Sequence, residues 1–409
     1  MTIIVSVTLV FFLFTQTLSI KNAESAPVYV GVAFQGSNVA EAKLLIDRVK
    51  DYTNLFVLGS SPVSRNETAT NEVASYAIAK GLNLMVNFGY YDPHALSPED
   101  SWRNWTWQLP WLDTAKQKWG SRFFGVYYDD EPGGMQIDYD WAGFFKNYSW
   151  YFNLPGEGPL KGIYEKIHEA NATGLLPADY DLEAHYYVDD ILKENQGHTL
   201  LKDAGAMTLT SDYSLYWFDY LGGYDSMLAQ FGWDHSIVQD IALVKGAARL
   251  QDKLWGAIVT WKYDKPPYLD SGEEIYNQMV QAYQAGASYI MIFNYPKLDG
   301  NDYGVMQDEH FAALEKFWDV VVQPNVGHAR EFGKPDVALV LPRNYGWGMR
   351  ASSDKIWGMW GPDEKSPQIW DISRKLLSQY GLRLDIVYDD PAFPLAGRYN
   401  RVYYWNESA

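Results

Sequence analysis

Eight short runs of β-branched and aromatic residues, alternating with stretches whose apolar residues have helical spacing, constrain this chain more than any other feature. Strands that alternate with helices are typical of repeated βα units, a parallel sheet and the α/β fold class. Eight units in succession suit closure into a (β/α)8 TIM barrel, for which 409 residues are long enough. The expected strands are Val28–Phe34, Leu55–Leu58, Leu82–Phe88, Phe123–Asp129, Ala206–Thr210, Ser226–Phe231, Trp255–Trp261 and Tyr289–Phe293.

Helical patterns separate most of these strands. They cover Val39–Tyr52, Thr68–Lys80, Leu112–Trp119, Ile237–Lys253, Glu273–Ala285 and Glu309–Val322. The connection Tyr213–Tyr224 is short, aromatic and Gly-rich, and it shows no clear helix. The alternative architecture is an open doubly wound sheet, which binds its ligand where the strand order reverses. No Gly-x-Gly-x-x-Gly follows the first strand, which favours the barrel.

The barrel is expected to span residues 27–333, with a long aromatic insertion after the fourth strand at about residues 135–204. Helical patterns occur in this insertion near Leu160–Ala170 and Asp181–Lys193. A break in composition at Gly333–Pro335 starts a small flavodoxin-like α/β unit, residues 334–409, which we expect to be minimal or incomplete. Its expected elements are a strand at Val337–Leu341, a helix at Gln368–Tyr380, and strands at Leu384–Val387 and Val402–Tyr404.

The N-terminus carries an almost unbroken apolar run, Ile3–Phe14, followed by the polar stretch Lys21–Ala26. This pattern predicts a signal peptide over residues 1–26, or an uncleaved membrane anchor, and hence a protein that is secreted or held at the extracellular surface. The chain has no cysteine, so disulfides and cysteine nucleophiles are excluded. Sequons for N-glycosylation begin at Asn66, Asn104, Asn147, Asn171 and Asn406.

Charge and composition limit the classes of ligand that this chain is expected to bind. A net charge of -18 would repel nucleic acid and anionic membrane surfaces. Aromatic residues make up 16% of the chain, and rings suit flat apolar ligand faces such as those of sugars. No P-loop, Gly-x-Ser-x-Gly, dinucleotide or His-Glu-x-x-His motif is present, so no cofactor or metal is expected. Glu183-x-His185 is more typical of a surface than of a metal site.

Three adjacent carboxylates, Asp129, Asp130 and Glu131, end the fourth strand, and Pro132 then breaks it. Catalytic groups of TIM barrels lie at the C-terminal ends of strands. Strand alternation would put Asp129 and Glu131 on one face, about 7 Å apart at the backbone, with Asp130 on the other. Repulsion and burial should raise the pKa of one of them, so that it can donate a proton near neutral pH. The alternative is a solvated turn with no catalytic role.

The motif Asp130-Glu131-Pro132 resembles the Asn-Glu-Pro that ends the fourth strand in a large clan of retaining barrel glycosidases. This resemblance implies that Glu131 is the general acid/base. The chain differs from the clan in having Asp130 in place of Asn, and in a seventh strand that ends Trp261-Lys262-Tyr263-Asp264 without the nucleophilic Glu.

A second resemblance covers the same strand. Gly125 to Glu131 is similar to the Asp-x-Glu ending of strand four in chitinase-like enzymes, in which the acetamido group of the sugar attacks. That similarity implies that Glu131 is the acid and that Asp129 orients the acetamide, although Tyr127 replaces a further Asp. The C-terminal unit also resembles, in architecture alone, the accessory α/β domain of family 42 β-galactosidases.

Other strand ends supply expected contacts to a carbohydrate substrate. These are Asn87, Tyr90 and Asp92, Asp212 and Tyr213, Trp233 and Asp234, Trp261, Tyr263 and Asp264, and Asn294 and Tyr295. Asp212, Asp234 and Asp264 are candidates for a second catalytic carboxylate. The sequence thus predicts an exported glycoside hydrolase that uses Glu131, with Asp129 or Asp130 assisting. The alternative is a non-catalytic glycan-binding or cell-surface protein, as the missing Glu of the seventh strand would allow.

Overall fold

The computed structural model describes residues 27–95, 101–141, 178–326 and 337–407. Several features predicted from the sequence lie outside these ranges. They are the N-terminal segment 1–26, the helical pattern at Leu160–Ala170, the sequons at Asn147 and Asn171, and the break at Gly333–Pro335. No helix within the described ranges is long and apolar enough to cross a membrane.

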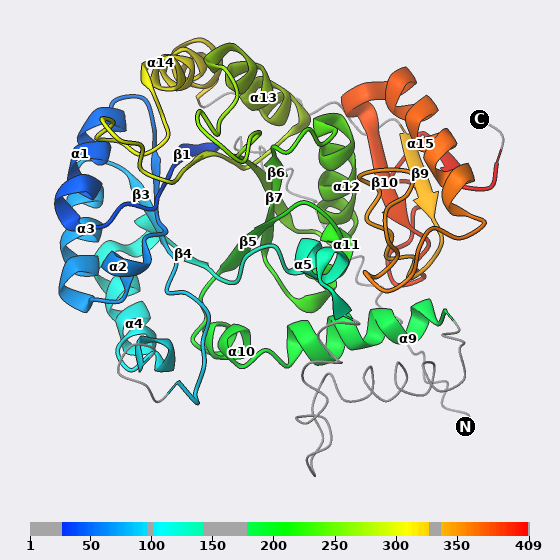
Figure 1. Cartoon of the computed structure of the whole chain (residues 1–409), viewed down its shortest axis with the longest axis horizontal. Helices are drawn as coiled ribbons and strands as arrows, with labels where there is room; N and C mark the ends of the chain where they lie inside the picture. The colour runs from blue at the N-terminus through cyan, green and yellow to red at the C-terminus, as the bar shows by residue number, and fades with distance from the viewer. Residues whose placement is uncertain (1–26, 96–100, 142–177, 327–336, 408–409) are drawn as a thin grey trace, which may run out of the picture.

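Eight parallel strands form a closed barrel in sequence order, and β1 pairs with β8 to complete the ring (Figure 1). Closure confirms the (β/α)8 TIM barrel and excludes the open doubly wound sheet. The strands are β1 (Tyr29–Phe34), β2 (Leu55–Leu58), β3 (Asn83–Val86), β4 (Phe123–Tyr127), β5 (Thr208–Asp212), β6 (Ser226–Phe231), β7 (Leu254–Val259) and β8 (Tyr289–Asn294).

Helices surround the barrel, and several begin at a side chain that accepts a hydrogen bond from the first turn. Asn38, Asn66, Asn195 and Ser271 each accept from the backbone N–H three residues on. The helices of the barrel and its insertion are α1 (Val39–Val49), α2 (Ser61–Ser64), α3 (Glu67–Ala79), η1 (Ser101–Asn104), α4 (Gln108–Trp119), η2 (Gly120–Arg122), α5 (Pro132–Asp138), α9 (Tyr180–His185), η3 (Tyr186–Lys193), α10 (Gln196–Asp203), α11 (Tyr216–Gly222), α12 (Ile237–Leu250), α13 (Gly272–Ala285), α14 (Asp308–Phe317), η4 (Trp318–Val322) and η5 (Gln323–Asn325).

Apolar side chains fill the barrel, so its mouth has a closed floor. Alternate residues of each strand point inward, and the strand ends therefore present their last inward-pointing residues to the mouth. The buried inner cluster consists of Ala33, Leu55, Val57, Met85, Leu209, Leu228, Ile258, Tyr289 and Met291. The next inward positions on β5 and β6 are Ser211 and Gln230, which are polar.

Two expectations about the connections are wrong. The segment between β5 and β6 contains α11, where six of seven residues are buried, so no polar face marked it in the sequence. The fourth strand ends at Tyr127 rather than Asp129, and the short helix α5 follows it. Pro132 begins α5 because proline fits the first turn of a helix, where its missing N–H is not needed.

The C-terminal unit is a three-stranded parallel sheet of order β10-β9-β11. Its elements are β9 (Val337–Leu341), α15 (Ser366–Tyr380), η6 (Gly381–Arg383), β10 (Leu384–Tyr388) and β11 (Arg401–Tyr404), close to the expected positions. The unit lies beside α12 (Figure 1), and a Cβ at Gly246 of α12 would meet the Ile386 carbonyl at 2.6 Å. Buried Asp385 accepts from Arg249 and pairs with Lys245 across this contact.

Candidate active site at the barrel mouth

The chain turns sharply after β4. Asp129 and Glu131 have φ of 59° and 55°, in the left-handed region, and Glu131 is the residue before the first turn of α5. Strand alternation therefore ends at Tyr127, and the prediction that Asp129 and Glu131 share a face is wrong. Asp130 and Glu131 instead belong to one hydrogen-bonded network at the mouth, while Asp129 borders a separate cavity.

This network joins the ends of β4, β5 and β6. The Tyr127 hydroxyl donates to Asp130 Oδ1 at 2.5 Å, and Ser211 Oγ lies 3.1 Å from the same oxygen. Gln230 Nε2 donates to Glu131 Oε1 at 2.7 Å and to Ser211 Oγ at 2.9 Å. Ser211 and Gln230 thus bridge the two carboxyl groups and fix their positions at the mouth.

The two carboxyl groups differ in their protonation. Burial, and then the charge of Asp130, raise the pKa of Glu131 to about 7, although the Gln230 hydrogen bond opposes the rise. Burial raises the pKa of Asp130 to about 6, against the hydrogen bonds from Tyr127 and Ser211. Asp130 is nevertheless exposed at the rim, whereas Glu131 is half-buried. Because water stabilises the Asp130 carboxylate, we assign the proton to Glu131. The site can therefore hold an acid beside a carboxylate near neutral pH.

Asp212 holds the loop after β4 in place and does not reach the mouth. Its side chain is fully buried, and its oxygens accept from the backbone N–H of Gly133 at 2.6 Å and Gly134 at 2.8 Å. Tyr213 and Ser214 also donate their backbone N–H to it. The predicted direct role of Asp212 in the mouth is therefore wrong. It anchors the first turn of α5 instead, directly after Glu131.

Three predicted aromatic contacts from three strands come together. We call Trp233, Trp261 and Tyr295 the aromatic platform. The Trp261 ring lies 6.2 Å from the Tyr295 ring at 13° and 6.0 Å from the Trp233 ring at 63°. Trp261 Nε1 donates to the Tyr295 carbonyl at 2.5 Å, which fixes the indole between the loops after β7 and β8. Trp233 and Tyr295 are 42% and 44% exposed, so the platform offers ring faces to a ligand.

The remaining predicted substrate contacts differ in whether a ligand could reach their side chains. Asn294 is buried, and its amide donates to the Tyr303 carbonyl and accepts from Met306 N, so it is not open to a ligand and the expected substrate contact is wrong. Asn87 is half-buried and accepts from Gly89 N at 2.6 Å. Tyr263 and Asp264 are exposed on the loop after β7.

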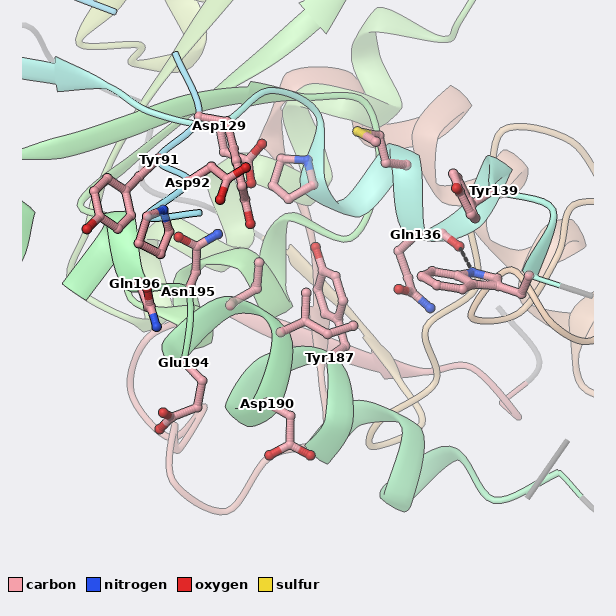
Figure 2. A pocket seen from close by; sticks show the side chains of 17 residues that line it. Tyr91, Asp92, Asp129, Gln136, Tyr139, Tyr187, Asp190, Glu194, Asn195 and Gln196 are labelled. Atoms are coloured by element: carbon pink, nitrogen blue, oxygen red, sulfur yellow. Dashed lines mark hydrogen bonds between the residues drawn. The ribbon is translucent and has the colours of Figure 1, made fainter. Parts of the chain in front are cut away.

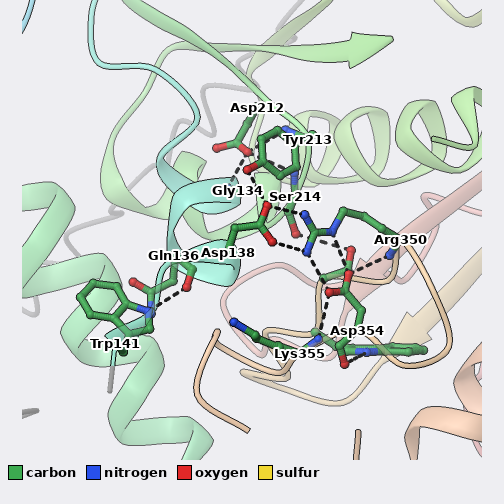
Figure 3. Close-up of polar contacts among 12 residues, drawn as sticks. Gly134, Gln136, Asp138, Trp141, Asp212, Tyr213, Ser214, Arg350, Asp354 and Lys355 are labelled. Atoms are coloured by element: carbon green, nitrogen blue, oxygen red, sulfur yellow. Dashed lines mark hydrogen bonds and ion pairs between the residues drawn. The ribbon is translucent and has the colours of Figure 1, made fainter. Parts of the chain in front are cut away.

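Asp234 and Tyr213 have different partners. Asp234 has a side chain that is 81% exposed, 3.8 Å from Lys262 Nζ, so water screens its charge. The Tyr213 hydroxyl donates to Asp138 Oδ2 at 2.9 Å, and Arg350 of the C-terminal unit lies over its ring (Figure 3). The structure thus brings no second carboxylate from Asp212, Asp234 or Asp264 into the network of Glu131.

A cavity of about 570 Å³ lies beside the loop after β4 (Figure 2). Asp129 and Pro132 border it together with residues of η3 and α10, and Tyr90 and Asp92 from the loop after β3 complete that edge. Neither Asp130 nor Glu131 borders it. The cavity is therefore lined by other residues than the network of Asp130 and Glu131.

The sequence patterns did not indicate Ser211 and Gln230, which form hydrogen bonds with the carboxyl groups of Asp130 and Glu131. Their signal is a polar residue at an inward position where the preceding inward residues, Leu209 and Leu228, are apolar. Gln230 was expected only as part of a buried strand. A polar inward residue at the C-terminal end of a barrel strand would have indicated the mouth.

No protein-family model matches the chain, and no curated protein matches it. Solved structures with a similar course of the chain include a D-psicose 3-epimerase, at 11% identity over 72% of this chain and 100% of the other, with a TM-score of 0.38. Cellulose synthase subunit Z from Clostridioides difficile has 9% identity over 70% and 99%, with a TM-score of 0.39. A GH26-CBM35 β-(1,4)-mannanase from Podospora anserina has 12% identity over 73% and 62%, with a TM-score of 0.35. Such likenesses do not distinguish between activities.

Proposed function

We propose that this protein is a glycoside hydrolase with Glu131 as its general acid. The observation that carries the proposal is the half-buried Glu131 carboxyl at the mouth of a closed barrel. Burial and the charge of Asp130 raise the pKa of this carboxyl to about 7. Cleavage of a glycosidic bond requires a proton donor to the leaving oxygen and a second carboxylate nearby. Glu131 supplies the first and Asp130 the second.

Asp130 fits the assisting role better than Asp129. Tyr127 and Ser211 hold the Asp130 carboxylate in the network of Glu131. Asp129 Oδ1 instead accepts from the backbone N–H of Asp130, and its side chain borders the separate cavity. Asp130 would stabilise positive charge on the sugar ring or activate a water molecule, while Glu131 protonates the leaving group.

The substrate that we propose is an oligo- or polysaccharide. Exposed rings of the aromatic platform can stack on sugar faces, and carboxylates and amides around the mouth can accept hydrogen bonds from hydroxyl groups. We further propose that the enzyme is exported, because the apolar run Ile3–Phe14 is typical of a signal peptide or anchor.

The test is the isosteric substitution Glu131→Gln. Reducing ends released from a panel of polysaccharides would be measured for the original protein and for the variant. A lost general acid lowers the rate by about 10²- to 10⁴-fold, so the variant should be nearly inactive. Glu274→Gln, an exposed position on α13, is the matched control and should keep full activity. Undiminished hydrolysis by Glu131→Gln would refute the assignment.

A second candidate function is glycan binding without catalysis. It is favoured by the end of β7, where Thr260 and Trp261 follow Val259 and bring no carboxylate to the mouth. A retaining glycosidase of the clan that strand four resembles would carry its nucleophile there. This candidate predicts that the original protein binds polysaccharide and releases no reducing ends on prolonged incubation. Turnover that disappears in Glu131→Gln would exclude it.

A further inference from the structure

The hydroxyl of Tyr127 has a fixed direction within the network at the mouth. The Ser211 backbone N–H donates to Tyr127 Oη at 3.2 Å, so this oxygen already accepts a hydrogen bond. Its own proton is directed to Asp130 Oδ1, which lies 2.5 Å away. That distance is in the range of a hydroxyl that donates to a charged carboxylate, and such bonds are stronger than those between neutral groups.

Ser211 supplies a second donor to the same carboxyl group. Its Oγ accepts from Gln230 Nε2 at 2.9 Å and donates to Asp130 Oδ1 at 3.1 Å. The same Oγ lies 2.6 Å from Tyr127 Oη, where either oxygen can be the donor. A proton that Ser211 gives to Tyr127 strengthens the next bond of the chain, so both arrangements support a negative charge on Asp130. The Ser211 carbonyl also accepts from Glu131 N at 3.0 Å, which holds the loop after β4 against β5.

These donors leave one oxygen of each carboxyl group open. Both hydroxyls are directed to Oδ1 of Asp130, and no residue that the structure describes donates to Oδ2. Gln230 donates to Oε1 of Glu131, and Oε2 has no donor among the same residues. Asp130 is exposed at the rim, where a ligand or water can reach it. Each carboxyl group therefore has one oxygen that the protein holds and one that is available.

Hydroxyl donors, and not cations, stabilise the charge of Asp130. Asp129 and Glu131 flank it in the chain, and within the described ranges no Lys, Arg or His forms an ion pair with it. Burial raises the pKa of Asp130 to about 6, the hydrogen bonds from Tyr127 and Ser211 oppose this rise, and the charge of Asp129 adds to it. Burial, and then the charge of Asp130, raise the pKa of the Tyr127 hydroxyl well above its usual range, so this group remains a donor.

We propose that Tyr127 is a positioning residue, which together with Ser211 keeps Asp130 ionised and directs Oδ2 of Asp130 toward the reacting sugar. This inference rests on the proposed function, because it concerns the charge with which Asp130 assists Glu131. Without the Tyr127 hydroxyl, Asp130 would compete with Glu131 for the proton, since their pKa values are about 6 and about 7. Tyr127 thus ensures that Glu131, and not Asp130, is the acid of the pair.

The ionisation of Asp130 can be measured without catalysis. NMR spectra of protein with isotope-labelled aspartate would follow its carboxyl signal through a pH titration, and Asp130→Asn would identify that signal. In Tyr127→Phe the pKa of Asp130 should rise by about one, a tenfold change in the ionisation constant, as expected when a hydrogen bond to a charged group is lost. Ser211→Ala removes the longer bond and should raise the pKa less, whereas Ser211→Thr keeps the hydroxyl and should preserve the original value.

The pH profile of kcat/KM provides a second measurement. In Tyr127→Phe its acidic limb should move to higher pH, and its maximum should fall about twofold, because half of the singly protonated protein would hold the proton on Asp130. Tyr76→Phe is the matched control, since the Tyr76 hydroxyl donates to Asp47 at 2.6 Å, between α3 and α1 on the outside of the barrel. It should change neither the Asp130 signal nor the profile.

An unchanged pKa of Asp130 in Tyr127→Phe, or an equal change in Tyr76→Phe, would overturn the inference. Ser211→Ala answers the same question if Tyr127→Phe does not fold. If glycans are cleaved through Glu131 while the titration of Asp130 does not respond to Tyr127, only this inference fails. If the titration responds as expected and no glycan is cleaved, the proposed hydrolase fails and the effect of Tyr127 on Asp130 stands.

Discussion

Two opposing effects set the pKa of Glu131, and a single substitution can remove one of them. Burial and Asp130 raise the pKa of Glu131 to about 7, and the hydrogen bond from Gln230 lowers it. A general acid works only while protonated, so kcat/KM should fall as pH rises through about 7. In Gln230→Leu the lowering influence is lost, and the alkaline limb should move to higher pH. Gln278→Leu on α13 should not move it, and an unmoved limb in Gln230→Leu would contradict the role of Gln230.

Behind the loop after β4, Asp212 and Asp219 are both fully buried. Asp212 accepts from four backbone N–H groups, whereas Asp219 accepts only from the Tyr187 hydroxyl, at 2.6 Å, among the described residues. Burial, and then the charge of Asp212, raise the pKa of Asp219 well above its usual value. Burial also raises the pKa of Asp212, to about 8, but the backbone hydrogen bonds to its carboxyl oppose this rise. Asp219 lacks such backbone donors, so we assign the more strongly held proton of the pair to Asp219.

This assignment predicts how stability depends on pH. Asp219 keeps a proton in the folded protein that it loses in the unfolded chain above about pH 4, so the free energy of unfolding should fall as pH rises. Asp219→Asn is neutral in both states and should reduce that fall. Urea unfolding at about pH 5 and about pH 8 measures the change in the free energy of unfolding between the two pH values. The substitution Asp371→Asn, at an exposed position, is the control. Parallel pH dependences for the original protein and Asp219→Asn would show that Asp219 is ionised when folded.

At single positions, the sequence marked the acidic cluster after the fourth strand and misjudged the neighbours of Glu131. Glu131 could be found because three acids end a strand before a proline. Its partner could not be assigned by alternation, because the left-handed backbone at Asp129 and Glu131 rotates the side chains out of strand geometry. Asp212 looked like a mouth residue because no local pattern shows that the next loop will surround it with backbone amides.

At the scale of elements, the helix α5 depends on a close approach that requires glycine. A Cβ at Gly134 would lie 2.1 Å from the Tyr213 ring. Gly134→Ala should displace either Tyr213 or α5, at a cost of roughly 1–3 kcal/mol, and should lower kcat/KM because Glu131 precedes the same turn. Gly361→Ala, where nothing lies within 4 Å, is the control for both unfolding and kinetics. If kcat/KM is unchanged in Gly134→Ala, the position of α5 does not affect catalysis.

Element positions followed the hydrophobic pattern in the short apolar strands and in the helices that have a solvent face. All eight barrel strands and the helices with a solvent face, such as α1 and α13, lie close to their expected ranges. The helix α11 was missed because nearly all of its residues are buried, and a helix buried on every side has no polar stripe. The strand ends moved by a few residues because the loop geometry that ends a strand, as at Asp129, leaves little local signal.

For the molecule as a whole, the C-terminal unit is bound to α5, the helix that follows Glu131. Arg350 donates to both oxygens of Asp138, at 2.8 and 2.7 Å, and Asp354 of its own unit holds the same guanidinium (Figure 3). Asp138 ends the helix that begins after Glu131. Sequence composition could mark the start of a second unit, but it could not show that this unit supports the site, since the contact spans 212 positions of the chain.

A double-mutant cycle with Arg350→Met and Asp138→Asn tests this connection. Asp138 has a side chain that is 51% exposed, so solvent screening should limit the coupling in unfolding free energy to about 1 kcal/mol. We also expect kcat/KM to fall in both single variants, because α5 loses its outer support. The exposed pair Lys43 and Glu72, 2.6 Å apart between α1 and α3, provides a matched cycle that should leave kcat/KM unchanged. If Arg350→Met lowers stability and leaves kcat/KM intact, the C-terminal unit stabilises the barrel without positioning Glu131.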